Sequence, residues 1–272
     1  MTSVAAVLLA ARAKLPASEA RLLLGHVLGR PAAWLIAHDD EVLEEAALLS
    51  FASLAARRAS GEPVAYLVGH REFFGREFAV SPAVLIPRPE TELLVEISLE
   101  RIGIGEGQKI LDLGTGSGCI AVTLALEIPS AQVSAVDISE AALVVAGKNA
   151  ERHGARLRLL RSNWFDELTG ECFDLIVANP PYVAAADPHL AAGDLRHEPP
   201  AALSSGAEGL DSIRRIIAGA PAQLAPDGQL WLEHGYDQAA AVRKLLAAAG
   251  LADIEQHRDL AGIVRVSGGR LR

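Results

Sequence analysis

The chain has 272 residues, half of them hydrophobic, which is enough for one large domain or for a large domain with a small one. Acidic residues outnumber basic residues by 34 to 25, so the formal net charge is -9. A surface of this charge offers no basic field to hold a phosphate backbone, and we do not expect duplex DNA as a partner.

Cysteine content and hydropathy indicate a protein of the cytoplasm. Cys119 and Cys172 each lie within an apolar stretch, which favours two buried thiols in a reducing compartment. Residues 4–11 are apolar, but no basic segment precedes them, so a helix is expected there rather than a signal peptide. No uncharged run reaches the roughly 18 residues that a membrane-spanning helix needs, and no membrane partner is expected.

Three parts follow one another along the chain. Apolar residues recur at helical spacing through residues 1–72, which predicts a small helical domain that we expect to bind the substrate. Aromatic and alternating residues then predict a β-hairpin linker over residues 73–87. Residues 88–272 form the larger domain.

Arg88 stands between Pro87 and Pro89, which hold the backbone around it in an extended form. In that setting an arginine can clamp a ligand or can be a solvated linker residue, and the sequence favours neither. Glu90 or Thr91 then starts a helix.

Strands and helices alternate after residue 108, which is typical of a parallel sheet with helices on both faces. The strands are predicted at 109–113, 132–136, 157–160, 173–178, 229–233, 253–257 and 263–266. The helices are predicted at 119–126, 139–149, 211–224 and 237–249. The last two strands follow each other as a hairpin, which would place one antiparallel strand in the sheet.

A glycine-rich loop joins the first of these strands to the helix after it. Its residues, which we expect to hold a cofactor, are Gly114, Thr115, Gly116, Ser117 and Gly118. Glycine at every second position lets the backbone turn tightly and lets a ligand lie directly on it. The third glycine comes one place earlier than in the G-x-G-x-x-G fingerprint, which argues against a dinucleotide pyrophosphate.

Three further residues are expected beside the same cofactor. Asp137 ends the second strand and can accept hydrogen bonds from a ribose diol. Asn163 and Trp164 follow the third strand, where an amide and a large ring could bracket a flat base. The carboxyl ends of parallel strands are where open α/β sheets bind ligands, so the layout fits a nucleoside cofactor without a pyrophosphate. S-adenosylmethionine is the natural candidate.

The fourth strand ends in Asn179, Pro180, Pro181 and Tyr182. Consecutive prolines donate no hydrogen bonds and keep their neighbours extended, which leaves the backbone carbonyl groups of Asn179 and Pro180 free. With the Asn179 side-chain carbonyl and the Tyr182 ring, the tetrad can hold a planar NH2 group, either an amide or the exocyclic amine of a base. A proline-rich turn after a strand is the alternative interpretation.

A long connection follows from residue 183 to about residue 207, and connections of this length are usually functional or mobile. It carries His189, His197 and Glu198. Their spacing matches no metal-binding motif, so no metal site is expected.

The chain resembles the seven-stranded S-adenosylmethionine-dependent methyltransferases in its glycine loop, in Asp137 and in the Asn-Pro-Pro-Tyr tetrad. More narrowly, it is similar to the peptide chain release factor glutamine-N5 methyltransferases. The segments that carry this second resemblance are Gly61-Glu62-Pro63, Arg71-Glu72-Phe73, Ile86-Pro87-Arg88-Pro89-Glu90-Thr91-Glu92, Asn163-Trp164-Phe165, Asp187-Pro188-His189-Leu190 and Glu233-His234-Gly235.

The resemblance implies a Rossmann-like seven-stranded methyltransferase domain over 88–272, preceded by the small helical domain. It implies methylation of the side-chain amide of the glutamine in the Gly-Gly-Gln motif of bacterial release factors. Asn179 Oδ1 and the Pro180 carbonyl would accept the two N–H bonds of that amide, and Tyr182 would pack on its plane. The family usually has Asp where Asn163 stands, and this departure bears on cofactor affinity rather than on function.

Other functions fit part of the pattern. An N6-adenine methyltransferase acting on DNA or RNA would use the same tetrad for an adenine amine, but the acidic charge weighs against it. A module that binds the cofactor without turnover would not need Asn179 and Tyr182. A dehydrogenase would need the dinucleotide fingerprint that the glycine spacing lacks.

Overall fold

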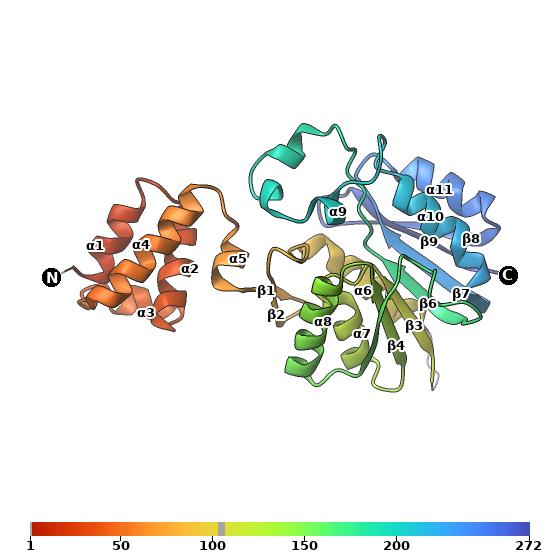
Figure 1. Cartoon of the computed structure of the whole chain (residues 1–272), viewed down its shortest axis with the longest axis horizontal. Coiled ribbons are helices and arrows are strands. Elements are labelled where there is room, and N and C mark those ends of the chain that lie inside the picture. The colour runs from red at the N-terminus through yellow and green to blue at the C-terminus, as the bar shows by residue number, and fades with distance from the viewer. Residues whose placement is uncertain (1, 103–106) are drawn as a thin grey trace. The chain divides into compact units, whose positions relative to one another are not determined.

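The computed structural model describes residues 2–102 and 107–272. The chain divides into two compact units, which Figure 1 shows in full. Unit 1 is Met1–His70 together with the distant segment Gly193–His197, and unit 2 is Arg71–Ala192 with Glu198–Arg272. The sequence predicts divisions at residues 72 and 87, and none of its patterns predicts that Gly193–His197 groups with unit 1.

Unit 1 is helical, as the apolar spacing predicts. Its helices are α1 (Val4–Ala11), α2 (Ala17–Leu28), α3 (Ala32–Ala37), α4 (Glu45–Ala59) and α5 (Val64–Val68). Gly29 and Gly69 end α2 and α5 in the left-handed conformation, with φ of 61° and 81°, which glycine adopts without a steric penalty. Leu23, Leu24 and Leu35 are among the side chains that fill the core between the helices.

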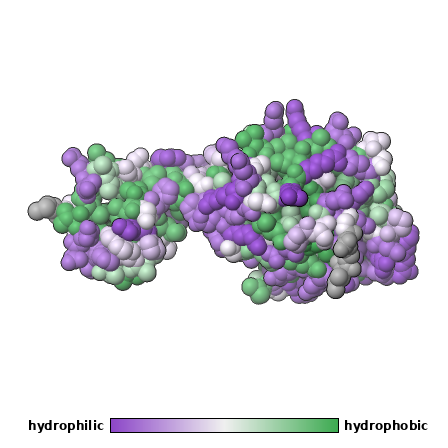
Figure 2. All heavy atoms as spheres, turned by 90° about the horizontal axis from the view of Figure 1, so that it is seen from below, coloured by the Kyte–Doolittle hydropathy of each residue, from purple (hydrophilic) through white to green (hydrophobic). Residues whose placement is uncertain are grey.

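Apolar side chains also reach the surface of unit 1. Figure 2 shows hydrophobic and hydrophilic surface interspersed on it. Its large hydrophobic residues that are at least half exposed are Leu9, Leu22, Ile36, Val42 and Leu49.

A β-hairpin of β1 (His70–Phe73) and β2 (Arg76–Ala79) comes next in the chain. Phe74 and Gly75 form its turn, both with positive φ. The hairpin begins three residues before the predicted linker of 73–87. A 3-10 turn over Pro89–Thr91 then leads into α6 (Glu92–Arg101).

The larger unit holds a seven-stranded sheet in the order β5-β4-β3-β6-β7-β9-β8. The strands are β3 (Lys109–Leu113), β4 (Gln132–Asp137), β5 (Leu157–Arg161), β6 (Phe173–Ala178), β7 (Leu224–Glu233), β8 (Leu251–Arg258) and β9 (Val264–Leu271). Strand β9 lies antiparallel between β7 and β8, and the other pairs are parallel. The predicted fold class and the single antiparallel strand are therefore confirmed.

Helices cover both faces of this sheet (Figure 1). Helices α6, α7 (Cys119–Glu127) and α8 (Glu140–His153) pack on one face, and α10 (Asp211–Gly219) and α11 (Ala239–Ala248) pack on the other. Along β3 the side chain of Ile110 joins the first core, whereas Leu111 and Leu113 join the second. This alternation is the period of two that a strand buried on both faces requires.

Two predicted details are wrong. The helix predicted to run to residue 224 ends at Gly219, because Pro221 follows and Leu224 already pairs with Phe173 of β6. Cys172, expected to be buried, is exposed, while Cys119 is buried. Cys172 precedes β6 by one residue, and the first buried side chain of this strand is that of Phe173.

Candidate active site

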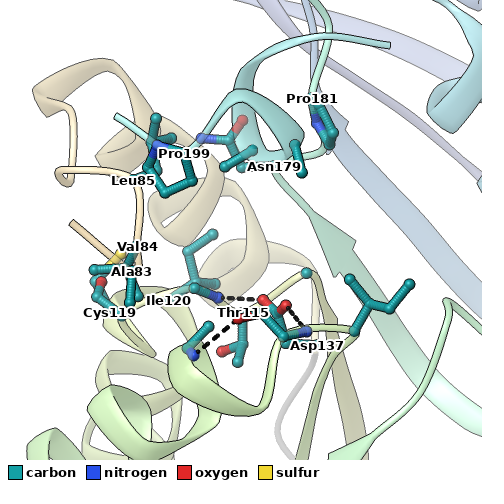
Figure 3. Close-up of a pocket in the computed structure, with 18 of the residues that line it drawn as sticks. Ala83, Val84, Leu85, Thr115, Cys119, Ile120, Asp137, Asn179, Pro181 and Pro199 are labelled. Atoms are coloured by element: carbon teal, nitrogen blue, oxygen red, sulfur yellow. Dashed lines mark hydrogen bonds between the residues drawn. The ribbon is translucent and has the colours of Figure 1, made fainter. Parts of the chain in front are cut away.

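A cavity of about 230 Å³ opens at the carboxyl ends of β3, β4 and β6. It is lined by residues of unit 2, and Figure 3 shows Asn179 and Pro181 on one side of it, with Thr115 and Asp137 across from them. This is the edge of an open α/β sheet where ligands bind. The structure thus brings the glycine loop, Asp137 and the start of the tetrad together around one space.

The glycine loop is held firmly under this cavity. Gly114, Gly116 and Gly118 all have positive φ, at 72°, 54° and 80°. The amide groups of Gly114 and Thr115 both donate to the Val136 carbonyl at 2.9 Å, which ties the loop to the end of β4. A Cβ on Gly116 would meet no atom within 4 Å, so open space lies against the loop at that point.

Asp137 is fixed by two backbone amides. Its Oδ2 accepts from the Gly116 N–H and its Oδ1 from the Ser139 N–H, both at 2.9 Å (dashed in Figure 3). Each carboxylate oxygen keeps a further lone pair, so the group can still accept from a ligand hydroxyl. Ser139 caps α8 by accepting from the Ala142 N–H at 3.2 Å, as the sequence predicts.

Asp112 lies under the loop and is fully buried. Its Oδ2 accepts a hydrogen bond from Thr115 Oγ1 at 2.6 Å. The pKa of Asp112 is raised to about 7, chiefly by burial and also by the nearby negative charge of Asp137, while the hydrogen bond from Thr115 lowers it. The carboxyl group therefore changes protonation near neutral pH.

Asn163 and Trp164 line the cavity, as the sequence analysis proposes. Trp164 has a positive φ of 59°, and its backbone carbonyl accepts from Ser162 Oγ at 2.9 Å. The Trp164 ring lies 3.3 Å from the point where a Cβ on Gly114 would stand. A side chain at position 114 would press on the ring and would also strain the backbone, whose φ is 72°.

The tetrad contributes unequally to the cavity. Asn179 and Pro181 line it, whereas Pro180 is buried and the Tyr182 ring packs into the second core of the sheet. Asn179 Nδ2 donates to Thr91 Oγ1 at 3.0 Å. Asn179 Oδ1 is buried and accepts no hydrogen bond from any residue that the structure describes. Such an atom is costly unless a ligand supplies a donor.

Glu233 at the end of β7 connects the tetrad to the sheet. Its Oε1 accepts from the Tyr182 hydroxyl at 3.0 Å, and its Oε2 accepts from Thr91 Oγ1 at 2.7 Å. Burial raises the pKa of Glu233, and the hydrogen bonds from Thr91 and Tyr182 lower it. Burial and the Glu233 charge raise the pKa of Tyr182, so that hydroxyl stays protonated.

The sequence analysis did not assign Thr91 and Glu233 to the site. For Glu233 a signal was present, because it ends a parallel strand as Asp137 and Asn179 do. For Thr91 the signal was its place in the segment from Ile86 to Glu92, which carries the family resemblance, and at a helix start.

Arg88 forms an ion pair with Glu198, whose side chain is fully buried. Glu198 Oε2 also accepts from the Ile86 amide at 3.0 Å. The pair holds down the start of a segment in which Pro199, Ala201 and Ala202 line the cavity. Arg88 is thus a clamp within the protein rather than a solvated linker residue.

The other predicted features of the long loop lie elsewhere. His189 is exposed and bonds to Asp187 at 2.7 Å, and His197 belongs to unit 1. Within residues 2–102 and 107–272, no three His, Cys, Asp or Glu side chains gather in a way that could hold a metal ion. The same part of the chain has no helix that is long and apolar enough to cross a bilayer.

The cavity suits S-adenosylmethionine in the chemistry of its walls. A carboxylate with spare lone pairs at Asp137 matches a ribose diol, and the bare backbone at Gly116 leaves space for a ligand against the loop. Apolar side chains such as Ile120 and Ile138 line it between these groups. Burial raises the pKa of the Cys119 thiol to about 12, so this lining residue is a protonated packing group rather than a nucleophile.

Comparison with known families finds two matches that divide the chain. The model of the methyltransferase small domain matches residues 89–208, and that of the PrmC N-terminal domain matches residues 2–69.

Curated relatives match along nearly the whole chain. A release factor glutamine methyltransferase of Bordetella pertussis is 54% identical over 258 residues, which are 94% of this chain and 96% of the relative. Another, of Burkholderia pseudomallei, is 56% identical over 264 residues, covering 94% of this chain and 93% of the relative.

Solved structures show the same fold at low identity. A methyltransferase of Pyrococcus furiosus matches with a TM-score of 0.56 at 18% identity, covering 80% of this chain and 98% of that one. The hMettl16 catalytic domain, solved with an RNA hairpin, matches with a TM-score of 0.59 at 16% identity, covering 80% and 81%. At such identities the likeness concerns the fold alone.

Proposed function

The chain belongs to the family of release factor glutamine methyltransferases, and we propose that it methylates N5 of the glutamine in the Gly-Gly-Gln motif of a peptide chain release factor. S-adenosylmethionine is the methyl donor. The observation that supports this target best concerns Asn179, which lines the cavity and whose buried Oδ1 accepts from no donor within the part of the chain that the structure describes. A primary amide offers the N–H group that this oxygen lacks.

Two sets of residues would serve the reaction. Asn179 Oδ1 and the Pro180 carbonyl would accept the two amide N–H bonds, and Pro181 and Tyr182 would keep this corner of the chain rigid. The residues that would hold the cofactor are Gly114, Thr115, Gly116, Ser117, Gly118, Asp137, Asn163, Trp164 and Asn179.

The chain's own task is chiefly one of positioning. An amide nitrogen is a poor nucleophile because its lone pair is delocalised into the carbonyl group, so orientation has to supply much of the acceleration. When bound, the cofactor supplies an activated methyl group on a sulfonium centre. Asn179 and Pro180 would aim the nitrogen by holding both of its protons. One of these protons leaves after the N–C bond has formed and the nitrogen has become acidic, so no strong base is required beforehand.

The partner is a protein of the translation machinery. Two glycines before the target residue would let the factor's backbone enter a narrow site. The net charge of -9 disfavours duplex DNA as a substrate. We further propose that unit 1 binds the release factor, and that the reaction takes place in the cytoplasm, where release factors act.

Transfer of labelled methyl groups tests this proposal. Purified enzyme and S-adenosylmethionine are incubated with release factor, with the factor carrying Gln→Ala in Gly-Gly-Gln, and with DNA and RNA. We expect label on the unaltered factor alone, and loss of about 100-fold or more in rate with the enzyme variant Asn179→Ala. Label on nucleic acid with none on the factor would overturn the proposal in favour of an adenine methyltransferase.

A further inference from the structure

Three side chains from separate elements form a chain of hydrogen bonds that ends at the cavity. Glu233 ends β7, Thr91 ends the 3-10 turn before α6, and Asn179 follows β6. Thr91 Oγ1 lies 2.7 Å from Glu233 Oε2 and 3.0 Å from Asn179 Nδ2. Glu233 and Thr91 are at most 2% exposed, so water does not replace either partner.

The direction of these hydrogen bonds follows from the number of protons available. An ionised carboxylate has no proton and only accepts, and Glu233 accepts from the hydroxyls of both Thr91 and Tyr182. Both oxygens of Glu233 therefore accept from hydroxyl groups. Burial raises the pKa of Glu233, and these two donors and the nearby charge of Arg265 oppose that rise. Thr91 has one hydroxyl proton and gives it to Glu233. Toward Asn179 its oxygen can therefore only accept.

This fixes which way the Asn179 amide points. Its Nδ2 has to face Thr91, because the reversed amide would set two oxygen atoms against each other with no proton between them. Oδ1 is then the atom that faces away from Thr91, and it is buried and accepts from no donor among the described residues. Thr91 and Glu233 therefore determine that Asn179 presents its oxygen, and not its NH2 group, to a ligand.

We propose that Glu233 and Thr91 are positioning residues that hold Asn179 as an acceptor and thereby make the site select an amide over a carboxylate. This inference rests on the proposed function. Glutamine presents an NH2 donor to Asn179 Oδ1, whereas glutamate presents only acceptors and would leave two oxygens facing each other. Sites built to hydrogen-bond one group discriminate strongly against an analogue that lacks it.

Binding measurements with two forms of the same substrate test the inference. The dissociation constants of release factor and of its Gln→Glu form are measured with wild-type enzyme and with Thr91→Val and Glu233→Gln. Valine matches threonine in shape but has no hydroxyl, and glutamine at 233 can donate to Thr91 and so let the Asn179 amide reverse. Wild type is expected to prefer the glutamine form by at least about tenfold. Both variants are expected to lose that preference, to within about threefold of equal binding.

Two further variants separate positioning from loss of structure. Thr91→Ser keeps the hydroxyl and is expected to restore the preference. Thr123→Val removes another buried threonine hydroxyl, which bonds to the Cys119 carbonyl within α7, and is expected to behave as wild type. Circular dichroism checks that the Thr91 and Glu233 variants are folded.

The inference is overturned if folded Thr91→Val and Glu233→Gln both keep the wild-type preference. It is overturned equally if wild type binds the two forms of the factor with the same affinity, a result that does not depend on any variant folding. Failure of the proposed function is distinct, because wild-type enzyme would then transfer no methyl group to the factor.

Discussion

Asp112 is a fully buried carboxyl group whose protonation the fold perturbs. Its pKa rises from 3.8 to about 7, chiefly through burial. The folded state therefore binds this proton more tightly than the unfolded state does. The associated stability is fully present below pH 4 and is lost as the pH rises through 7.

We predict that Asp112→Asn reduces the decline in stability between pH 5 and pH 8. Between pH 5 and the folded pKa of about 7 the decline spans about two pKa units, an upper bound of roughly 3 kcal/mol in the free energy of unfolding. Urea denaturation at both pH values measures the free energy of unfolding. The exposed Asp174→Asn is the control, and its stability should decline between the two pH values as that of wild type does. Equal slopes for wild type and Asp112→Asn would contradict the assigned burial effect.

At the residue scale, the sequence could predict side chains placed by strand ends but not those placed by packing. Asp137 and Asn179 follow short apolar strands, and the parallel sheet brings such ends together whatever their partners are. Thr91 and Glu233 meet because a 3-10 turn and β7 pack side by side, and the local sequence does not specify which hydroxyl faces which carboxylate. A buried hydrogen-bond partner is a property of tertiary structure.

At the level of elements, the segment after Glu198 owes its place to one buried ion pair. Glu198 binds Arg88 and the Ile86 amide, and Pro199, Ala201 and Ala202 then line the cavity. Removing one charge of such a pair leaves the other uncompensated.

We therefore expect Glu198→Gln to loosen this wall of the cavity. The dissociation constant for S-adenosylmethionine, measured by calorimetry, should rise about tenfold, which corresponds to roughly 1.4 kcal/mol. The matched control is Glu208→Gln, which breaks an exposed pair with Arg214 and should leave the affinity within twofold or so. Unchanged affinity in Glu198→Gln would show that the pair does not hold the wall.

Two glycines of similar backbone conformation can be compared, Gly118 in the glycine loop and Gly154 at the end of α8. Gly118 has φ of 80° and a Cβ there would lie 3.0 Å from the Ala146 Cβ, whereas Gly154 has φ of 69° with nothing within 4 Å. A substitution at either glycine is strained by the left-handed backbone, but only a substitution at Gly118 also clashes with α8.

We predict that Gly154→Ala lowers the free energy of unfolding by about 1 kcal/mol and Gly118→Ala by roughly 2–3 kcal/mol. Urea denaturation of the two variants provides the measurement. Equal losses would mean that α8 yields to the added methyl group and that the loop is less constrained than its contacts indicate.

Element boundaries show where sequence patterns stop being informative. β3 and β6 have the predicted bounds because each is a short apolar run between polar residues. Helix α8 continues four residues past the predicted end to His153, since only Gly154 provides a left-handed C-cap. Strand β7 begins at Leu224, although Pro226 and Gly228 read as a turn, because pairing with β6 outweighs local preference.

At the scale of the whole molecule, the two units have different surfaces and, we propose, different tasks. Among the described residues of unit 1, five large hydrophobic side chains are at least half exposed, and Leu49 is one of them at 66%. Leu49 also lines a shallow hollow with His26 and Val27. Exposed apolar groups of this kind are common in protein-binding surfaces.

If unit 1 binds the release factor, Leu49→Ser should affect a whole protein substrate and spare a short one. We expect KM for intact factor to rise about fivefold, while a peptide containing Gly-Gly-Gln is methylated as by wild type. Leu260→Ser, at an exposed position of unit 2, serves as control. A parallel change with both substrates would instead point to an effect on the site itself.

The division into units could be predicted only in part. The helical pattern of the first 70 residues predicts a separate domain, but Gly193–His197 joins unit 1 through side chains distant in sequence. Arg58 bonds to both Glu19 and Asp194, with 136 residues separating it from the latter. No periodicity in the sequence predicts such a contact.

The proposed acceptor of the methyl group is a glutamine amide held by Asn179. Tandem mass spectrometry of release factor after reaction tests this proposal, because fragment masses locate the added group on a single residue. We predict one added methyl group on the glutamine of Gly-Gly-Gln with wild-type enzyme and none with Asn179→Ala. A methyl group on another residue, or an unmodified factor after incubation with active, cofactor-binding enzyme, would contradict the account.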